Sequence, residues 1–298
     1  MSYTRVFTGP KPKLQMPKGA CDTHIHFYDD RYLTVPGTPT PPAVSVTEYK
    51  QVMDWLGIER VIVVQANAYG DDNRLVMDST AALGHDRARA VVVVKPGVAD
   101  TELERLTKGG ARGVRVMNLL GGTLKLDVAE QMAARIKPFN WSMLLQLNGR
   151  ELPDHEAMIK RLPVRIIIDH VGKFIDPVPV DHPAFQCLLR LIDTGNVWVK
   201  LAGWYETSLT GKPSYDDVGV LARALIKHAP ERMIWATNFP HAQADKFGYP
   251  DESKLLDLLL DWAPNEAGRK YSSITPRNCT VSDGYRLFRL TAAVIHSI

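Results

Sequence analysis

The sequence of 298 residues predicts a (β/α)8 barrel of the TIM type, folded as one domain. Two observations support this fold class. Eight short runs of apolar, mostly β-branched residues follow one another along the chain, and amphipathic segments separate most of them. Continuous apolar runs are typical of parallel strands buried on both faces. Strands that alternate with helices over this length favour a closed barrel.

Each predicted strand is a run that ends in polar residues. In chain order the runs are ACDTHIHF (20–27), RVIVVQA (60–66), ARAVVVVKP (88–96), GVRVMN (113–118), SMLLQL (142–147), VRIIIDH (164–170), VWVKLAG (197–203) and RMIWATN (232–238). Their lengths suit strands better than helices.

The segments between the strands carry the helical pattern. In VTEYKQVMDWLG, residues 46–57, four apolar side chains share one face and the glycine ends the helix. A doubly wound open sheet is the alternative, but no G-x-G-x-x-G follows the first strand. We expect one domain over residues 1–298, with an N-terminal arm at 1–18 and a C-terminal tail at about 289–298.

Composition excludes several classes of protein. The net charge is +3 and no cluster of Lys and Arg resembles a nucleic-acid footprint, so we expect no nucleic-acid partner. No stretch approaches the ~18 apolar residues of a membrane span, and the N-terminus lacks the apolar core of a signal peptide. The three cysteines are widely spaced, so we expect no disulfide framework. This favours a protein of the reducing cytoplasm. The sequence leaves open whether the protein is a monomer or a homo-oligomer.

The predicted strand ends should form one mouth, where barrel enzymes carry their active sites. His24 and His26 are two apart, which places both on one face of the first strand. The other candidate site residues follow later strands: Asn67, Tyr69, Arg115, Gln146, His170, Lys173, Lys200, Trp204, Tyr205, Asn238 and His241.

Several of these candidates also have a structural explanation. Arg115 could pair with an acid inside the barrel, Lys200 could be a structural lysine, and Trp204 and Tyr205 could pack a loop. Arg115, Lys173 and Lys200 project toward one mouth without an obvious acidic cluster to balance them. We therefore expect a small anionic substrate, gripped by Arg115 through its carboxylate.

Four motifs together resemble a known family. DTHIHF, GVRVMN, IIIDHVGK and IWATNFPH, in this order at the strand ends, are similar to the amidohydrolase superfamily. More narrowly they resemble its branch of lactone-processing enzymes related to 2-pyrone-4,6-dicarboxylate lactonase. The resemblance covers roughly residues 19–288. It implies that His24, His26, His170 and Asn238 form the catalytic centre, and that Arg115, Gln146, Lys173 and the loop after Lys200 hold substrate carboxylates.

The resemblance also bears on metal. Many amidohydrolases bind one or two divalent ions through H-x-H, further histidines, an Asp on the eighth strand and often a carboxylated Lys. Here the fourth strand ends without a Lys or Glu ligand, and Asn238 is a poor ligand for Zn²⁺. We expect no cofactor and no required metal, zinc included, with protonated histidines and cationic side chains polarising a lactone carbonyl instead.

Asn238 stands where the family has the Asp of T-D-x-P-H, so the residue expected to activate water is missing. An amide has no useful basicity, whereas hydrolysis needs a base. One explanation is a metal-independent lactonase inactivated by this replacement, native or engineered. The other is an isomerase, in which a hydroxyl of the lactone attacks its own carbonyl and converts a 1,5-lactone of a sugar acid into the 1,4-lactone. A non-catalytic sugar-acid binding protein is the third. We favour the isomerase.

Overall fold

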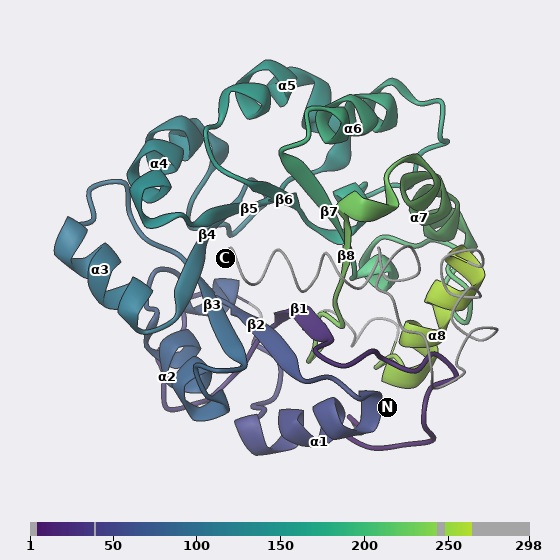
Figure 1. The fold of residues 1–298 in the computed structure, drawn as a ribbon, viewed down its shortest axis with the longest axis horizontal. Helices are drawn as coiled ribbons and strands as arrows, with labels where there is room; N and C mark the ends of the chain where they lie inside the picture. The colour runs from purple at the N-terminus through teal and green to yellow at the C-terminus, as the bar shows by residue number, and fades with distance from the viewer. Residues whose placement is uncertain (1–4, 39, 243–247, 264–298) are drawn as a thin grey trace, which may run out of the picture.

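Eight parallel strands form one sheet, and its neighbours follow chain order from β1 to β8. The structure is a computed structural model that describes residues 5–38, 40–242 and 248–263. The strands are β1 (Cys21–Ile25), β2 (Arg60–Val64), β3 (Ala88–Val92), β4 (Ala111–Met117), β5 (Ser142–Gln146), β6 (Ile166–Ile168), β7 (Val197–Leu201) and β8 (Met233–Trp235). The (β/α)8 barrel predicted from the sequence is confirmed (Figure 1).

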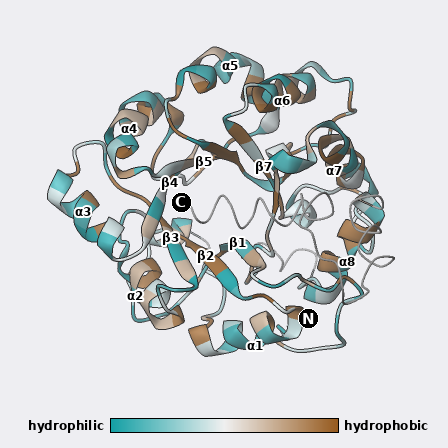
Figure 2. Cartoon of the chain, viewed as in Figure 1, coloured by the Kyte–Doolittle hydropathy of each residue, from teal (hydrophilic) through white to brown (hydrophobic). Residues whose placement is uncertain are grey.

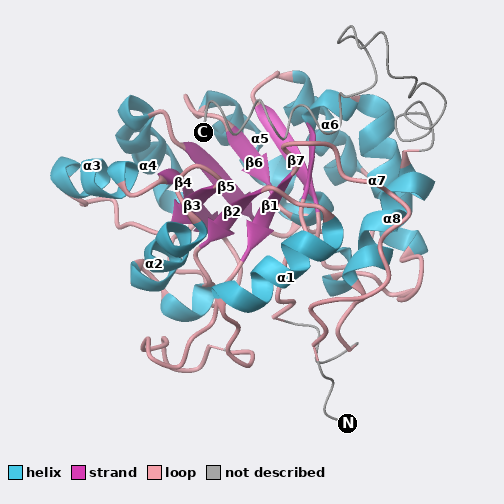
Figure 3. Ribbon diagram, turned by 60° about the horizontal axis from the view of Figure 1, so that its bottom comes forward, coloured by secondary structure: helices cyan, strands magenta, loops and turns pink. Residues whose placement is uncertain are grey.

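In the described part of the chain, eight α-helices surround the strands (Figure 3). They are α1 (Val46–Leu56), α2 (Arg74–Leu83), α3 (Asp100–Lys108), α4 (Ala129–Ile136), α5 (Leu152–Arg161), α6 (Pro183–Asp193), α7 (Asp216–His228) and α8 (Glu252–Trp262). Apolar faces of these helices pack on the outside of the barrel, and hydrophobic residues run along β5 and β7 (Figure 2). Ser45 precedes helix α1 as its N-cap and forms a reciprocal capping box with Glu48, which fixes where the helix begins.

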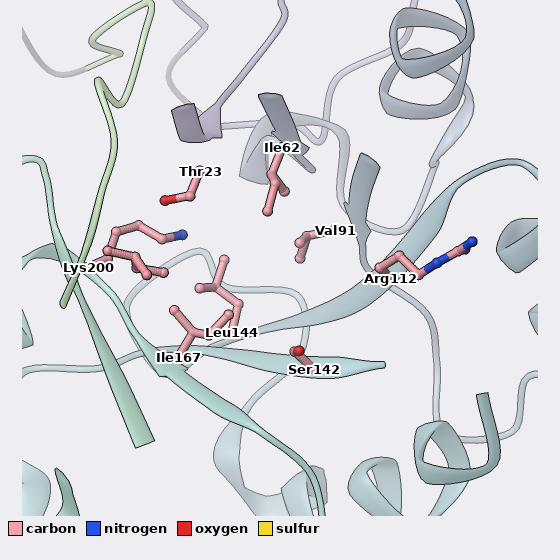
Figure 4. Close-up of a pocket in the computed structure, with 9 residues that line it drawn as sticks. Thr23, Ile62, Val91, Arg112, Ser142, Leu144, Ile167 and Lys200 are labelled. Carbon is pink, nitrogen blue, oxygen red and sulfur yellow. The ribbon is translucent and has the colours of Figure 1, made fainter. Parts of the chain in front are cut away.

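The interior of the barrel is packed below the mouth. Side chains from all eight strands line a cavity of about 20 Å³, enough for about one water molecule. Thr23, Ile62, Val91, Leu144 and Lys200 point into it (Figure 4). Among the described residues the barrel interior therefore has no room for a ligand, and the larger cavity lies at the carboxyl ends of the strands.

The seam between β1 and β8 closes the barrel by a few specific bonds. Ile25 and Phe239 form an isolated parallel bridge, and the His26 amide donates to the Phe239 carbonyl at 2.7 Å. The Asn238 amide donates to the His24 carbonyl at 3.0 Å. The two histidine-bearing motifs of the sequence thus lie side by side at this seam.

Two further observations bear on the predictions from sequence. In the described parts of the chain no helix is long and apolar enough to cross a membrane. The predicted tail at about 289–298 lies outside the described residues, and the single-domain boundaries stay a prediction.

Candidate active site

A cavity of about 590 Å³ opens at the carboxyl ends of the strands, a size typical of small-molecule sites. The predicted site residues that line it are His26, Asn67, Arg115, Gln146, His170, Lys173 and Asn238. They come from the ends of β1, β2, β4, β5, β6 and β8, so the fold brings together residues that lie far apart in the sequence.

His24 and His26 form a directed chain of hydrogen bonds. His26 Nδ1 lies 2.8 Å from the Val64 carbonyl, which can only accept, so this nitrogen carries the proton. His26 Nε2 is then the acceptor for His24 Nε2, 3.0 Å away. His24 Nδ1 in turn accepts from the Lys200 ammonium at 2.9 Å. The pairing of β1 with β2 shifts register between Asp22 and Ile25, and only His26 of the two histidines lines the cavity.

His24, His26 and His170 are neutral near pH 7, which corrects the expectation of protonated imidazoles. Burial lowers the pKa of His24 well below its usual value, and Lys200 lowers it further. Burial, with Arg115 nearby, lowers the pKa of His26 to about 3. Burial lowers the pKa of His170 to about 4, although Glu206 and Asp169 oppose the shift.

Asp169 and Lys200 form a buried ion pair beneath the histidines. The Lys200 ammonium lies 3.1 Å from Asp169 Oδ1, and His24 Nδ1 lies 3.4 Å from the same oxygen. Burial would raise the pKa of Asp169, but Lys200 and the two nearest histidines outweigh it and hold the pKa well below its usual value. Asp169 is therefore ionised.

Among the described residues, His24, Asp169 and His170 could hold a metal ion, because their ligand atoms lie within 4.8 Å of one another. The fit is incomplete, however. The Lys200 ammonium lies within hydrogen-bonding distance of His24 and beside Asp169, so a cation of the protein already contacts two members of this donor set. An ion bound there would meet that positive charge.

His170 is placed by an unusual backbone. His170, Val171, Gly172 and Lys173 all have positive φ angles, between 49° and 84°, just after β6. The imidazole packs against Gly203, where an added Cβ would lie 2.5 Å from His170 Nδ1. Gly203 itself has a φ of +60°, so glycine is required there for two reasons. His170 Nδ1 is buried and has no hydrogen-bond partner among the described residues.

Arg115 lines the cavity and forms no ion pair with a carboxylate among the described residues. Its guanidinium donates to the Gln65 carbonyl at 2.8 Å and to Gln146 Oε1 at 2.7 Å. These bonds fix the plane of the guanidinium while Nε keeps a free donor. Such a preorganised fork suits a carboxylate.

Lys173, by contrast, is paired with Glu206, a cavity residue that the sequence did not single out. Asn238 Nδ2 also donates to Glu206 Oε1 at 2.8 Å. The expectation that no acidic group balances the cationic strand ends is therefore wrong, since Glu206 balances Lys173 and Asp169 balances Lys200. In the sequence, Glu206 is marked only by its position directly after Trp204 and Tyr205.

Asn238 is held from behind by a second buried chain. Its Nδ2 donates to the Tyr205 hydroxyl oxygen at 2.7 Å, and that hydroxyl lies 2.8 Å from His241 Nδ1. His241 Nε2 donates to Glu252 Oε1 at 2.6 Å, on the first turn of α8. Because the carboxylate fixes the proton on Nε2, His241 Nδ1 accepts from Tyr205.

Six predicted site residues do not line the cavity: His24, Tyr69, Lys200, Trp204, Tyr205 and His241. His24 and Lys200 lie behind His26, and Tyr205 and His241 lie behind Asn238. Trp204 packs edge-on against Trp262 of α8, with 4.7 Å between ring centroids. The Tyr69 hydroxyl accepts from the Asp29 amide at 2.8 Å.

Known proteins resemble this chain along most of its length. The family model described as amidohydrolase matches residues 21–271. D-galactarolactone isomerase of Agrobacterium fabrum is 38% identical, covering 89% of this chain and 91% of its own. 4-Sulfomuconolactone hydrolase of Hydrogenophaga intermedia is 34% identical, covering 86% of each chain.

Two further comparisons extend this similarity. The enzyme of Comamonas testosteroni that hydrolyses 2-pyrone-4,6-dicarboxylate is 32% identical, over 85% of this chain and 87% of its own. An apo crystal structure from Agrobacterium tumefaciens superposes with a TM-score of 0.83 at 36% identity, covering 96% of this chain and 99% of the other. The chain belongs to the amidohydrolase family.

Proposed function

We propose that this protein is a lactone isomerase that converts an anionic sugar-acid lactone of the D-galactaro-1,5-lactone type into the 1,4-lactone. Its relatives include both a lactone isomerase and lactone hydrolases. Of the relatives named above, the isomerase shares more identical residues with this chain than the hydrolases do. The enzyme class is therefore lactone isomerase, with lactone hydrolase as the alternative.

The observation that carries the proposal is the environment of Asn238. Both hydrogens of its amide are engaged, one with Tyr205 and one with Glu206. An ionised carboxylate can only accept, so Glu206 fixes which end of the amide is nitrogen. The carbonyl oxygen of Asn238 is left to accept a hydrogen bond from a ligand. It can orient a hydroxyl, but it cannot deprotonate water.

A substrate hydroxyl makes a strong base less necessary. The attacking group and the carbonyl belong to one molecule, and effective molarities for well-oriented intramolecular attack reach ~10⁵ M or more. The 4-hydroxyl oxygen forms a bond to the lactone carbonyl carbon and gives its proton to a base. The tetrahedral intermediate then breaks its bond to the former ring oxygen, which takes the proton back.

We assign the proton transfer to His170. His24 and His26 have both ring nitrogens engaged in the chain that runs from Lys200 to the Val64 carbonyl. His170 is neutral and lines the cavity, and its imidazole has no hydrogen-bond partner among the described residues. A neutral imidazole with a free nitrogen can accept a proton and return it.

Arg115 binds the substrate carboxylate, and hydrogen bonds to Gln146 and to the Gln65 carbonyl hold its guanidinium in place. Lys200 lies under His24 and away from the cavity, so its proposed role is to fix the proton positions of His24 and His26. We further propose that the reaction needs no metal, because the Lys200 ammonium contacts the donor set that an ion would use. Loss of activity on chelation, with recovery on adding zinc, would contradict this.

The reaction should take place in the cytoplasm. Cys21 and Cys187 are free and buried, which suits a reducing compartment.

The decisive experiment separates three outcomes. D-galactaro-1,5-lactone is incubated with the protein, followed by proton NMR, while a pH-stat measures base uptake. We expect the 1,4-lactone to appear without base uptake. Uptake equal to the lactone consumed would mean a hydrolase, and binding without change would mean a non-catalytic protein. His170→Asn should be inactive, whereas His155→Asn on α5 should match the wild type.

A further inference from the structure

We propose that Glu206 makes this site selective for lactones that carry a single carboxylate, and that it excludes dicarboxylates. The inference rests on the proposed function, because it assumes that the cavity described above binds the substrate. It goes further in assigning to one residue the choice between two kinds of lactone.

The first step is the charge of the cavity wall. Among the described residues that line it, the charged side chains are Arg115, Lys173 and Glu206. His26 and His170 line it too, but both are neutral. Because Glu206 cancels Lys173, the wall keeps one uncompensated positive charge, which belongs to Arg115.

The second step is that Glu206 is held in place and ionised. Its side chain and that of Lys173 are each 7% exposed, and Asn238 donates to its other oxygen. Burial alone would raise the pKa of Glu206, but Lys173, His170 and Asn238 outweigh burial and lower the pKa to about 2. A second carboxylate near Lys173 would meet this negative charge at close range.

The third step concerns what Glu206 attracts. A carboxylate has about four lone-pair positions, and Lys173 and Asn238 each take one. The remaining positions on a cavity-lining carboxylate can accept hydrogen bonds from hydroxyl groups. The wall therefore favours a polyhydroxylated ring whose one carboxylate pairs with Arg115. It disfavours a ring with two carboxylates, because the second carboxylate would find no cation to pair with.

Binding tests this better than turnover, because Glu206 also contacts Asn238 and raises the pKa of His170. Calorimetry should compare three probes: D-galactaro-1,4-lactone with one carboxylate, 2-pyrone-4,6-dicarboxylate with two, and a neutral sugar lactone with none. The variants are Glu206→Gln and the double variant Glu206→Gln/Lys173→Met. Glu156→Gln is the matched control, because Glu156 also pairs with cations, Lys160 and Arg190, but far from the cavity.

We expect Glu206→Gln to free the Lys173 ammonium. The ratio of the two dissociation constants should shift at least ~10-fold in favour of the dicarboxylate, because charges this close interact strongly in a buried site. The double variant should lose that gain, and Glu156→Gln should match the wild type. The neutral lactone should change little in all of them.

An unchanged ratio in a folded Glu206→Gln variant would overturn the inference. So would a gain that persists without Lys173. These outcomes are separate from a failure of the proposed function. If the wild type proves to be a hydrolase and the ratio still shifts, the role of Glu206 stands; if the wild type isomerises its lactone and the ratio does not shift, only the inference falls.

Discussion

The side-chain amide of Asn238 donates a hydrogen bond to the carboxylate of Glu206, with 2.8 Å between nitrogen and oxygen. This contact decides what a carboxylate at position 238 would do. Asn238→Asp would place two acids side by side, and one of them would hold a proton because like charges at this distance cannot both ionise.

We therefore expect Asn238→Asp to lower isomerisation at least ~10-fold, because a carboxyl group at position 238 loses the two amide hydrogen bonds, to Tyr205 and Glu206, that orient its oxygen. Hydrolysis should appear only as a side reaction, since Glu206 hinders ionisation of the new acid. NMR and base uptake measure the two reactions in one experiment. An inert wild type together with strong hydrolysis by the variant would show instead a hydrolase inactivated at this position.

The pH profile should report the depressed pKa of His170. Burial lowers that pKa to about 4, so the base form persists well below the ordinary histidine value of ~6.5. We expect kcat/KM to stay flat from neutral pH downward and to fall only as the pH drops through about 4. A fall of kcat/KM centred near pH ~6.5 would assign the proton transfer to another group.

The same shift affects stability with a definite sign. Between pH ~6.5 and about 4 the unfolded chain protonates His170 while the folded chain does not. Stability should therefore fall as the pH falls through this window. Circular dichroism at each pH separates this loss from the catalytic limb.

Gly203→Ala should disable the site through His170. The new Cβ would lie 2.5 Å from Nδ1 and push the imidazole out of position. Gly211→Ala is a matched control, since Gly211 also has positive φ, +72°, but nothing lies within 4 Å of the added atom. Both variants should lose ~1 kcal/mol of stability from the backbone, measured by thermal unfolding. Only Gly203→Ala should lose turnover, at least ~10-fold, and equal activities would place His170 outside the reaction.

Arg115→Met should cut turnover of a carboxylated lactone at least ~100-fold, about 2.7 kcal/mol of transition-state stabilisation. A neutral lactone of equal ring size should be nearly unaffected, because the lost contact is with the carboxylate. Arg112→Met, on the same strand but at the interior cavity, serves as the control. Equal losses on both substrates would mean that Arg115 mainly supports Gln146 and the Gln65 carbonyl.

Lys200→Met should destabilise the fold by ~3 kcal/mol or more, because it leaves Asp169 ionised and unpaired in the barrel. Urea unfolding measures the loss. Adding Asp169→Asn should recover much of it by removing the stranded charge. If the single variant unfolds like the wild type, the pair contributes little.

The position of the site could be predicted from sequence because it follows from topology. Parallel strands of a barrel end at one mouth, so His26, His170 and Asn238 are found by reading strand ends. The predicted runs were longer than β6 and β8, since His170 and Asn238 leave the ladder with positive φ. Helices α2 and α3 were not predicted. The buried face of α2 includes the polar Ser79 and Thr80, and only Leu103 and Leu106 mark the buried face of α3 among charged residues.

The partners behind the cavity could not be predicted in the same way. Glu206 and Glu252 are ordinary acids in the sequence, and they matter only because Lys173 and His241 approach them across the fold. The protonation of His24 and His26 likewise depends on burial and on Lys200, which strand periodicity does not reveal. Which of the two histidines faces the ligand depends on how β1 pairs with its neighbours.

The seam between β1 and β8 links completion of the candidate site to the order in which the chain is made. Backbone bonds of His24 and His26 to Asn238 and Phe239 help to join the first strand to the last, so the same short segments close the barrel and form part of the candidate site. During synthesis the first strand must wait for more than two hundred residues before its partner emerges. A nascent chain stopped before Asn238 lacks the backbone bonds of His24 and His26 to this segment, and its candidate site is incomplete.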